Sequence, residues 1–196
     1  MSQFGEAFFL AWTTTPWTLP SNTALAVGRD IEYVLVKTFN QYTFEPINII
    51  LAKVLLQKNF GKKYAVGTDE DFQNYTAESK VIPYQIVAEF PGEDLAGTEY
   101  EQLIPWFLPA ENPESSEAYL DRREKNAFRV IIGDFVTTED GTGIVHIAPT
   151  FGADDARVAK ENGISPMLIK DENDNLVPLV DLQGKFIKGG NTPELF

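Results

Sequence analysis

The stretch FRVIIGDFVTTEDGTGIVHIAP, residues 128–149, says most about the fold. Two runs rich in valine and isoleucine, residue types that favour strands, flank a polar stretch. That stretch contains Asp140 and Gly141, a pair that is frequent in tight turns between paired strands. The sequence therefore predicts two strands that form a hairpin.

Other apolar runs extend the predicted sheet. Residues 7–12 (AFFLAW), 31–39 (IEYVLVKTF) and 81–90 (VIPYQIVAEF) are predicted strands, and the proline in the last places it at an edge or a bulge. Residues 91–103 (PGEDLAGTEYEQL) then indicate a turn followed by a short helix.

Two segments have helical patterns. In 45–61 (EPINIILAKVLLQKNFG) the apolar residues recur at helical spacing, with a proline suited to the first turn and a glycine beyond the end. Residues 153–163 (ADDARVAKENG) have acids in the first turn and Gly163 as a stop. Residues 109–127 are polar and charged, which predicts a surface excursion.

Several strands with few interspersed helices predict a mixed α/β fold. We expect a curved sheet that closes into a β-barrel-like core with short peripheral helices. The 196 residues fit a single domain spanning 1–196, since a chain of this length can bury a sizeable core.

Composition excludes several classes of function. The formal net charge of −13 repels a phosphate backbone, so broad nucleic-acid binding by this chain alone is not expected. With no cysteine and one histidine, disulfides, thiolate nucleophiles and multi-histidine metal sites are excluded, and no metal site is predicted. Without a long apolar run or a basic leader, we expect a cytoplasmic protein or an excised piece of one.

Two segments carry candidate chemistry: AWTTTPWTLPSN at 11–22 and GTGIVHIAPTFGADDARV at 141–158. Nucleophile-elbow, P-loop and dinucleotide-binding motifs are absent from the sequence. Taken singly, each feature has an ordinary structural explanation. His146 fits a buried strand, Asp154 and Asp155 fit a helix start, and Trp12 and Trp17 fit a core.

Together, however, WTTTPWTLPSN and GTGIVHIAPTFGADD resemble the threonine-rich segment and the second signature of one family. It is the editing domain inserted into class I isoleucyl-, valyl- and leucyl-tRNA synthetases. FPGEDLAGTEYEQL (90–103) is similar to the family's Gly-x-x-Leu-x-Gly-x-x-Tyr stretch. The matches run from residue 8 to residue 155 in the family's order. Histidine at position 146 resembles the isoleucyl branch, since the valyl branch usually has lysine there and the leucyl branch an apolar residue.

The resemblance implies post-transfer editing: hydrolysis of the ester of valyl-tRNA for isoleucine, and of valyl-adenylate as a further substrate. One methylene in an apolar pocket is worth only about 1–3 kcal/mol, a limit for which these synthetases are themselves the usual example. A second site that admits only the smaller amino acid removes the errors.

Site residues follow from the same resemblance. Asp155 would pair with the α-ammonium group, while His146 and Trp12 would shape the side-chain pocket. Asn22 would hold the loop that carries the threonines. Hydroxyls and backbone groups that meet the ester, the terminal adenosine and the attacking water would come from Thr13, Thr14, Thr15 and Thr18.

We expect water attack helped by the neighbouring ribose hydroxyl, with His146 acting as a sieve. His146 as general base is the alternative. Many family members have a histidine where this chain has Phe151, so any role of that second imidazole is in doubt here.

HIGH- and KMSKS-type motifs are absent, so the chain is predicted to be an excised editing insertion that needs no cofactor. ATP and metal would belong to the synthetic domain. Expected partners are the 3′ aminoacylated end of tRNA(Ile) and the remainder of the synthetase, with the chain itself a monomer. A valyl- or leucyl-type editing domain, and a non-catalytic module that binds aminoacyl-adenosine, remain alternatives.

Overall fold

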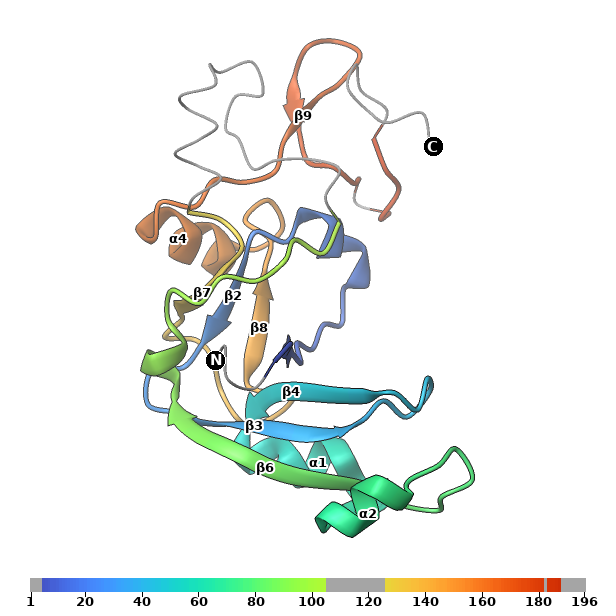
Figure 1. The fold of residues 1–196 in the computed structure, drawn as a ribbon. Coiled ribbons are helices and arrows are strands. Elements are labelled where there is room, and N and C mark those ends of the chain that lie inside the picture. The colour runs from blue at the N-terminus through green and yellow to red at the C-terminus, as the bar shows by residue number, and fades with distance from the viewer. Residues whose placement is uncertain (1–4, 105–125, 182, 188–196) are drawn as a thin grey trace.

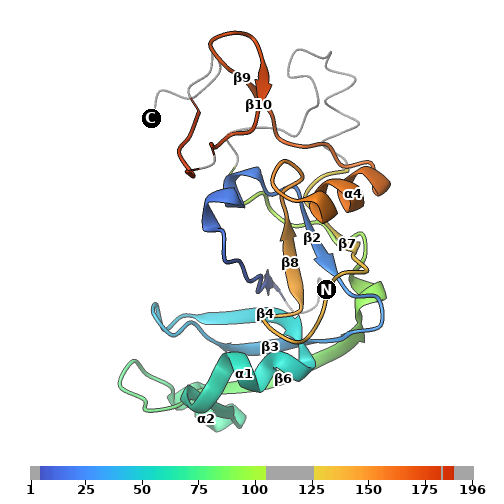
Figure 2. The ribbon, with the colours of Figure 1, turned by 180° about the vertical axis from the view of Figure 1, so that it is seen from behind.

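The computed structural model describes residues 5–104, 126–181 and 183–187, which form a mixed α/β fold with several sheets and few helices (Figures 1 and 2). One sheet has five strands in the order β1-β4-β3-β6-β5, another has three in the order β7-β2-β8, and β9 and β10 form a separate pair. The strands are β1 Phe8–Phe9, β2 Ala24–Val27, β3 Glu32–Phe39, β4 Pro46–Ala52, β5 Tyr64–Val66, β6 Ile82–Pro91, β7 Arg129–Ile132, β8 Ile144–Ile147, β9 Ile169–Lys170 and β10 Leu176–Val177.

The helices are short and lie outside the sheets (Figure 1). Helix α4, predicted at 153–163, is confirmed, and Gly163 follows it with a φ of 67°. The bounds are η2 Pro16–Ser21, η3 Lys53–Leu55, α1 Leu56–Phe60, η4 Gly61–Lys63, α2 Asp69–Asn74, η5 Gly92–Leu95 and α4 Ala153–Glu161.

Strand β3 is the centre of the five-stranded sheet and pairs antiparallel with β4 and β6. It is buried on both faces, because one face packs on the smaller sheet and the other is covered by α1 (Figures 1 and 2). The strands predicted at 31–39 and 81–90 are confirmed as β3 and β6. Residues 7–12 contribute only the two-residue strand β1.

The helix predicted across 45–61 is wrong for its first half. Residues Pro46–Ala52 form β4, and helical structure begins only at Lys53. Three isoleucines favour a strand here, and seven paired residues along β3 outweigh the helical spacing of the apolar side chains. Val54, one of the apolar residues at helical spacing in 45–61, is 69% exposed.

The hairpin predicted across 128–149 is also wrong, although both of its strands exist. β2 lies between them, parallel to β7 and antiparallel to β8. The reason is burial: β2 is the four-residue run ALAV, buried at every position, and it needs a partner on each edge. Gly141 still turns the chain, with a φ of 72°, but this turn leads into β8 without pairing it to β7.

The two larger sheets meet closely at Tyr33. Its buried hydroxyl donates to the carbonyl oxygen of Gly143 at 2.6 Å and accepts from the Gly28 N–H at 3.0 Å, and burial raises its pKa to about 12. Gly143 has a φ of 75°, and a Cβ atom there would lie 2.5 Å from Cβ of Ala52. Glycine is therefore required where the sheets touch.

Barrel closure stays a prediction, since the described strands form separate sheets. Among the isolated bridges between described residues, one joins Trp12 to Val145 of β8 and another joins Glu99 to Arg129 of β7. The surface excursion predicted at 109–127 lies, up to residue 125, outside the described residues. Within the described ranges, no helix has the length and apolar character needed to cross a lipid bilayer.

Candidate functional site

The threonine-rich stretch forms a tight loop whose hydroxyls bond to its own backbone. Pro16 occupies the first position of η2, where its missing N–H costs no hydrogen bond. The Thr15 N–H donates to Oγ1 of Thr13 at 3.0 Å, and the Thr18 hydroxyl donates to the carbonyl oxygen of Thr15 at 2.8 Å. The loop is thus held in one shape while Thr14 and Thr15 remain exposed.

The buried Thr18 side chain joins this loop to β8. Its Oγ1 atom lies 3.0 Å from Nε2 of His146. Because the single hydroxyl proton of Thr18 goes to the Thr15 carbonyl, the ring nitrogen must be the donor, and His146 carries its proton on Nε2.

His146 is 8% exposed, and among the described residues its Nδ1 atom has no hydrogen-bond partner. Burial lowers the pKa of His146 below its ordinary 6.5, and the negative charge of Asp155 opposes that shift. The ring is therefore neutral near pH 7, with its N–H used by Thr18.

Asp155 lies in the first turn of α4 and reaches back towards the end of β8. Its Oδ2 atom accepts from the Ala148 N–H at 2.8 Å. A Cβ atom at Gly152 would lie 2.9 Å from Oδ1 of Asp155, so glycine leaves room for the carboxylate. The short connection between β8 and α4 thus fixes the position of the Asp155 carboxylate.

These groups surround one hollow of about 450 Å³. Seven of the eight predicted site residues line it, from both halves of the chain. Its lining consists of Trp12, Thr13, Thr14, Thr15, Trp17, Thr18, Val145, His146, Ala148, Phe151, Gly152 and Asp155.

Asn22, the eighth predicted residue, lies next to the site but does not line the hollow. It is 5% exposed, its Nδ2 donates to the carbonyl oxygen of Ala24 at 2.8 Å, and its Oδ1 accepts from the Tyr100 hydroxyl at 2.6 Å. Tyr100 is the tyrosine of the stretch 90–103, so this bond joins the third sequence motif to the first.

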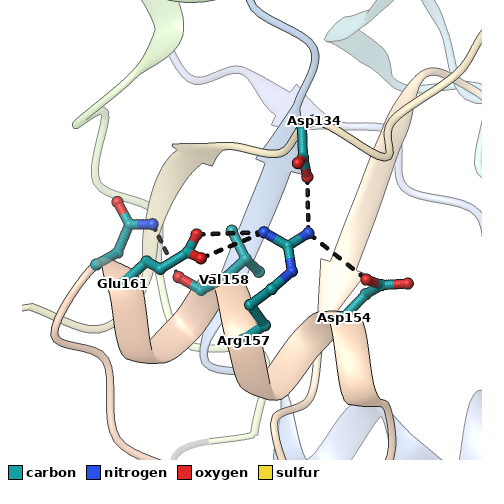
Figure 3. A network of polar contacts seen from close by, with 6 residues as sticks. Asp134, Asp154, Arg157, Val158 and Glu161 are labelled. Carbon is teal, nitrogen blue, oxygen red and sulfur yellow. Dashed lines mark hydrogen bonds and ion pairs between the residues drawn. The ribbon is translucent and has the colours of Figure 1, made fainter.

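The two consecutive acids of α4 have different surroundings. Asp154 lies 3.5 Å from Arg157, whose guanidinium also pairs with Asp134 at 2.8 Å and with Glu161 at 3.3 Å (Figure 3). The Arg157 hydrogen bond holds the pKa of Asp134 below its usual value. This exposed network links α4 to the loop after β7, and Asp155 is the acid left to face the hollow.

Several lining residues were not predicted from the sequence. Trp17 was expected only as a possible core residue, yet it is 46% exposed and lines the hollow beside Trp12, which was predicted as a pocket residue and is 57% exposed. Phe151 also lines it, so the position where relatives of the resembled family carry a histidine does face the site. Tyr100 was missed as well, although its place in a recognised motif was an available signal. No group of metal-ligating side chains occurs in the described part of the chain.

Comparison with curated proteins gives strong similarity to isoleucine–tRNA ligases. The chain is 54% identical over 186 residues to that of Bacteroides fragilis, covering 95% of this chain and 15% of the relative. It is 57% identical over 183 residues to that of Cytophaga hutchinsonii (93% and 15%) and 39% identical over 188 residues to that of Tetrahymena thermophila (92% and 14%). The chain thus spans about 15% of the length of these relatives.

No family model matches the chain. Among solved structures, one described as the crystal structure of GlLeuRS-CP1 aligns with a TM-score of 0.43 and 17% identity, covering 81% of this chain and 50% of the other.

Proposed function

The chain belongs to the isoleucine–tRNA ligase family, and we propose that it is an editing domain, spanning 1–196, that hydrolyses the ester of valyl-tRNA for isoleucine. Valyl-adenylate is proposed as a second substrate of the same site. One observation carries the proposal: the threonine hydroxyls, His146 and Asp155 line a single hollow of about 450 Å³.

Asp155 is the group that would bind the α-ammonium of the substrate. Among the described residues that line the hollow, it is the only charged one. One carboxylate oxygen accepts from the Ala148 N–H, which orients the side chain and leaves the other oxygen for a cation. An aminoacyl ester carries such a cation, whereas a hydroxy-acid ester does not.

The remaining walls suit a small aliphatic side chain. Trp12, Trp17, Val145 and Phe151 provide apolar surface beside the His146 ring. Because His146 is fixed by Thr18, its ring forms a wall that cannot easily move aside. We propose that this wall admits valine and excludes the additional methylene of isoleucine.

The threonine loop would meet the ester, the terminal ribose and the attacking water. Water adds to the ester carbonyl carbon, the bond to the ribose oxygen breaks, and that oxygen takes up a proton as valine leaves. Thr14 and Thr15 are exposed at the hollow and offer hydroxyls to the water or to the developing oxyanion. Since an aminoacyl ester is already activated, orientation together with the neighbouring ribose hydroxyl is sufficient.

The geometry favours the sieve role of His146 over the base role. A general base needs an accessible lone pair, but Nε2 is the donor to Thr18 and Nδ1 is buried. His146→Ala should therefore extend hydrolysis to isoleucyl esters. If it abolishes hydrolysis of every ester and removes an ionisation from the pH profile, the base role is correct.

The proposed partners are the 3′ aminoacylated end of tRNA(Ile) and the remainder of the synthetase, with the chain acting as a cytoplasmic monomer. The net charge of −13 supports this proposal, because a negatively charged domain repels the tRNA backbone and the backbone contacts would come from elsewhere in the enzyme.

The test is deacylation of valyl-tRNA(Ile) and of a minimal valyl-adenosine ester, with isoleucyl, threonyl and leucyl esters in parallel. We expect release of valine that is lost in Asp155→Ala and strongly reduced in Thr15→Ala. Binding of a nonhydrolysable valyl-adenosine mimic without turnover of the ester would indicate a non-catalytic module. Preference for a threonyl ester, or for a noncognate amino acid of the leucyl branch, would assign the chain to the valyl or leucyl type.

A further inference from the structure

Asn22 lies where the threonine loop ends and β2 begins, and both the nitrogen and the oxygen of its side-chain amide have a hydrogen-bond partner. Its backbone N–H donates to the carbonyl oxygen of Leu19 at 3.0 Å, which closes η2. Because Nδ2 donates to the Ala24 carbonyl, Oδ1 is the atom that accepts from the Tyr100 hydroxyl. The side-chain oxygen of Asn22 therefore relies on the hydroxyl proton of Tyr100 for this hydrogen bond.

Tyr100 is itself held firmly by the smaller sheet. Its N–H donates to the carbonyl oxygen of Phe128 at 2.8 Å, and the Phe128 N–H donates to the carbonyl oxygen of Thr23 at 2.8 Å. The Tyr100 and Phe128 rings also meet edge to face, with centroids 6.2 Å apart. The hydroxyl is thus presented to Asn22 from a rigid support.

Burial raises the pKa of Tyr100 well above its ordinary value, so the hydroxyl keeps its proton throughout the neutral range. Asn22 is only 5% exposed, and without that proton its side-chain oxygen would lose its partner. A buried acceptor left unpaired is costly, so the end of η2 would be expected to shift towards another partner or towards water.

We propose that Tyr100 is a positioning residue of the editing site: through Asn22 it fixes where η2 ends, and so holds Thr18 against His146. The inference rests on the proposed function for its catalytic consequence but not for its structural one. Tyr100 does not line the hollow, so it acts on the substrate only through the threonine loop.

The chain offers a matched control for the loss of one tyrosine hydroxyl. Tyr84, in β6 of the other sheet, accepts from the Gln57 side-chain amide at 2.7 Å and is 4% exposed. Tyr84→Phe and Tyr100→Phe each remove a hydroxyl bonded to a side-chain amide. Only Tyr100→Phe releases the threonine loop.

The experiment compares the full chain with these two variants on the valyl-adenosine ester. Misplacing a catalytic group by about 1 Å can cost up to about 100-fold in rate. We expect Tyr100→Phe to lower kcat by about 10-fold or more with KM within about twofold, and Tyr84→Phe to leave both unchanged. Asn22→Ala and the double variant Tyr100→Phe/Asn22→Ala should have the same kcat, since the two residues act as one unit.

A second readout is independent of activity. The chain has one histidine, so the nitrogen NMR signal of a selectively labelled imidazole reports on His146 alone. Exchange of its Nε2 proton with water should quicken in Tyr100→Phe and stay as in the parent in Tyr84→Phe. Equal exchange and equal kcat in the two variants would overturn the proposal. If the parent hydrolyses no ester, the exchange measurement alone decides the inference, and its result is separate from the failure of the proposed function.

Discussion

Nε2 of His146 lies 3.0 Å from Oγ1 of Thr18, a residue 128 positions earlier in the chain. Since this bond uses the one N–H proton of the neutral ring, it makes the imidazole a fixed wall of the hollow. It also means that the two sequence motifs are parts of one structure, whose rigidity can be tested from either side.

Replacing Thr18 by valine should destabilise the protein and impair editing. The change keeps the shape of the side chain but leaves the His146 Nε2–H and the Thr15 carbonyl without this partner, at a cost of about 1–3 kcal/mol. Urea unfolding and ester hydrolysis measure the two effects. Thr38→Val is the control, because it removes a buried hydroxyl bonded to the Pro83 carbonyl at 2.9 Å in the other sheet. Equal ester hydrolysis in the two variants would contradict a site role for Thr18.

Asp155→Asn should separate the charge of this side chain from its shape. An amide oxygen can still accept from the Ala148 N–H, so the melting temperature should change little. Loss of the charge-assisted bond to the ammonium group, worth about 1.5–3 kcal/mol, should lower kcat/KM by about 10- to 150-fold. Asp154→Asn serves as the control, since that acid pairs with Arg157 and does not line the hollow. A similar loss of kcat/KM in both variants would argue against an ammonium contact at Asp155.

Stability should fall as the pH drops through the range in which His146 titrates. Its pKa is lowered in the folded state, so below about 6.5 the unfolded chain binds a proton that the folded chain resists. The stability that comes from keeping His146 neutral is fully present above the unfolded pKa and is lost on acidification. The free energy of unfolding then falls by no more than about 1.4 kcal/mol per pH unit. Urea unfolding between pH 7.5 and 5.5 measures it. His146→Gln should flatten the dependence of stability on pH. Asp155→Asn should steepen it, because the Asp155 charge raises the pKa of His146 in the parent. An unchanged slope in both variants would refute the assignment of this pH dependence to His146.

Gly143→Ala should be far more damaging than another glycine substitution with the same backbone strain. Gly143 and Gly97 both have positive φ, 75° and 81°, but only at Gly143 would the new methyl collide, with Ala52. Adopting the left-handed conformation costs an alanine about 1–2 kcal/mol, and overpacking adds about 1–3 kcal/mol. Thermal unfolding of the two variants measures the difference, and equal losses would mean that the sheets can move apart at this point.

The parts of the fold that the sequence predicts correctly are those specified by local signals. Helix α4 has acids in its first turn and Gly163 after its end, and β3 and β6 are long apolar runs. The errors arise where a distant partner decides. The run INIILA becomes β4 because β3 is beside it, and β7 and β8 separate because the four-residue β2 inserts between them.

The candidate site shows the same division. Motif residues such as Thr15, His146 and Asp155 were named from the sequence and do gather at one hollow, while their roles stay predictions. The bonds from Thr18 to His146 and from Tyr100 to Asn22 could not be predicted, because they span 128 and 78 positions and depend on strand order.

The central place of β2 has a consequence for synthesis on the ribosome. Its two neighbours, β7 and β8, begin only at residues 129 and 144, so a nascent chain displays an apolar strand for about 100 residues before either edge can be covered. During that interval both edges of the strand are unpaired and open to pairing with another chain.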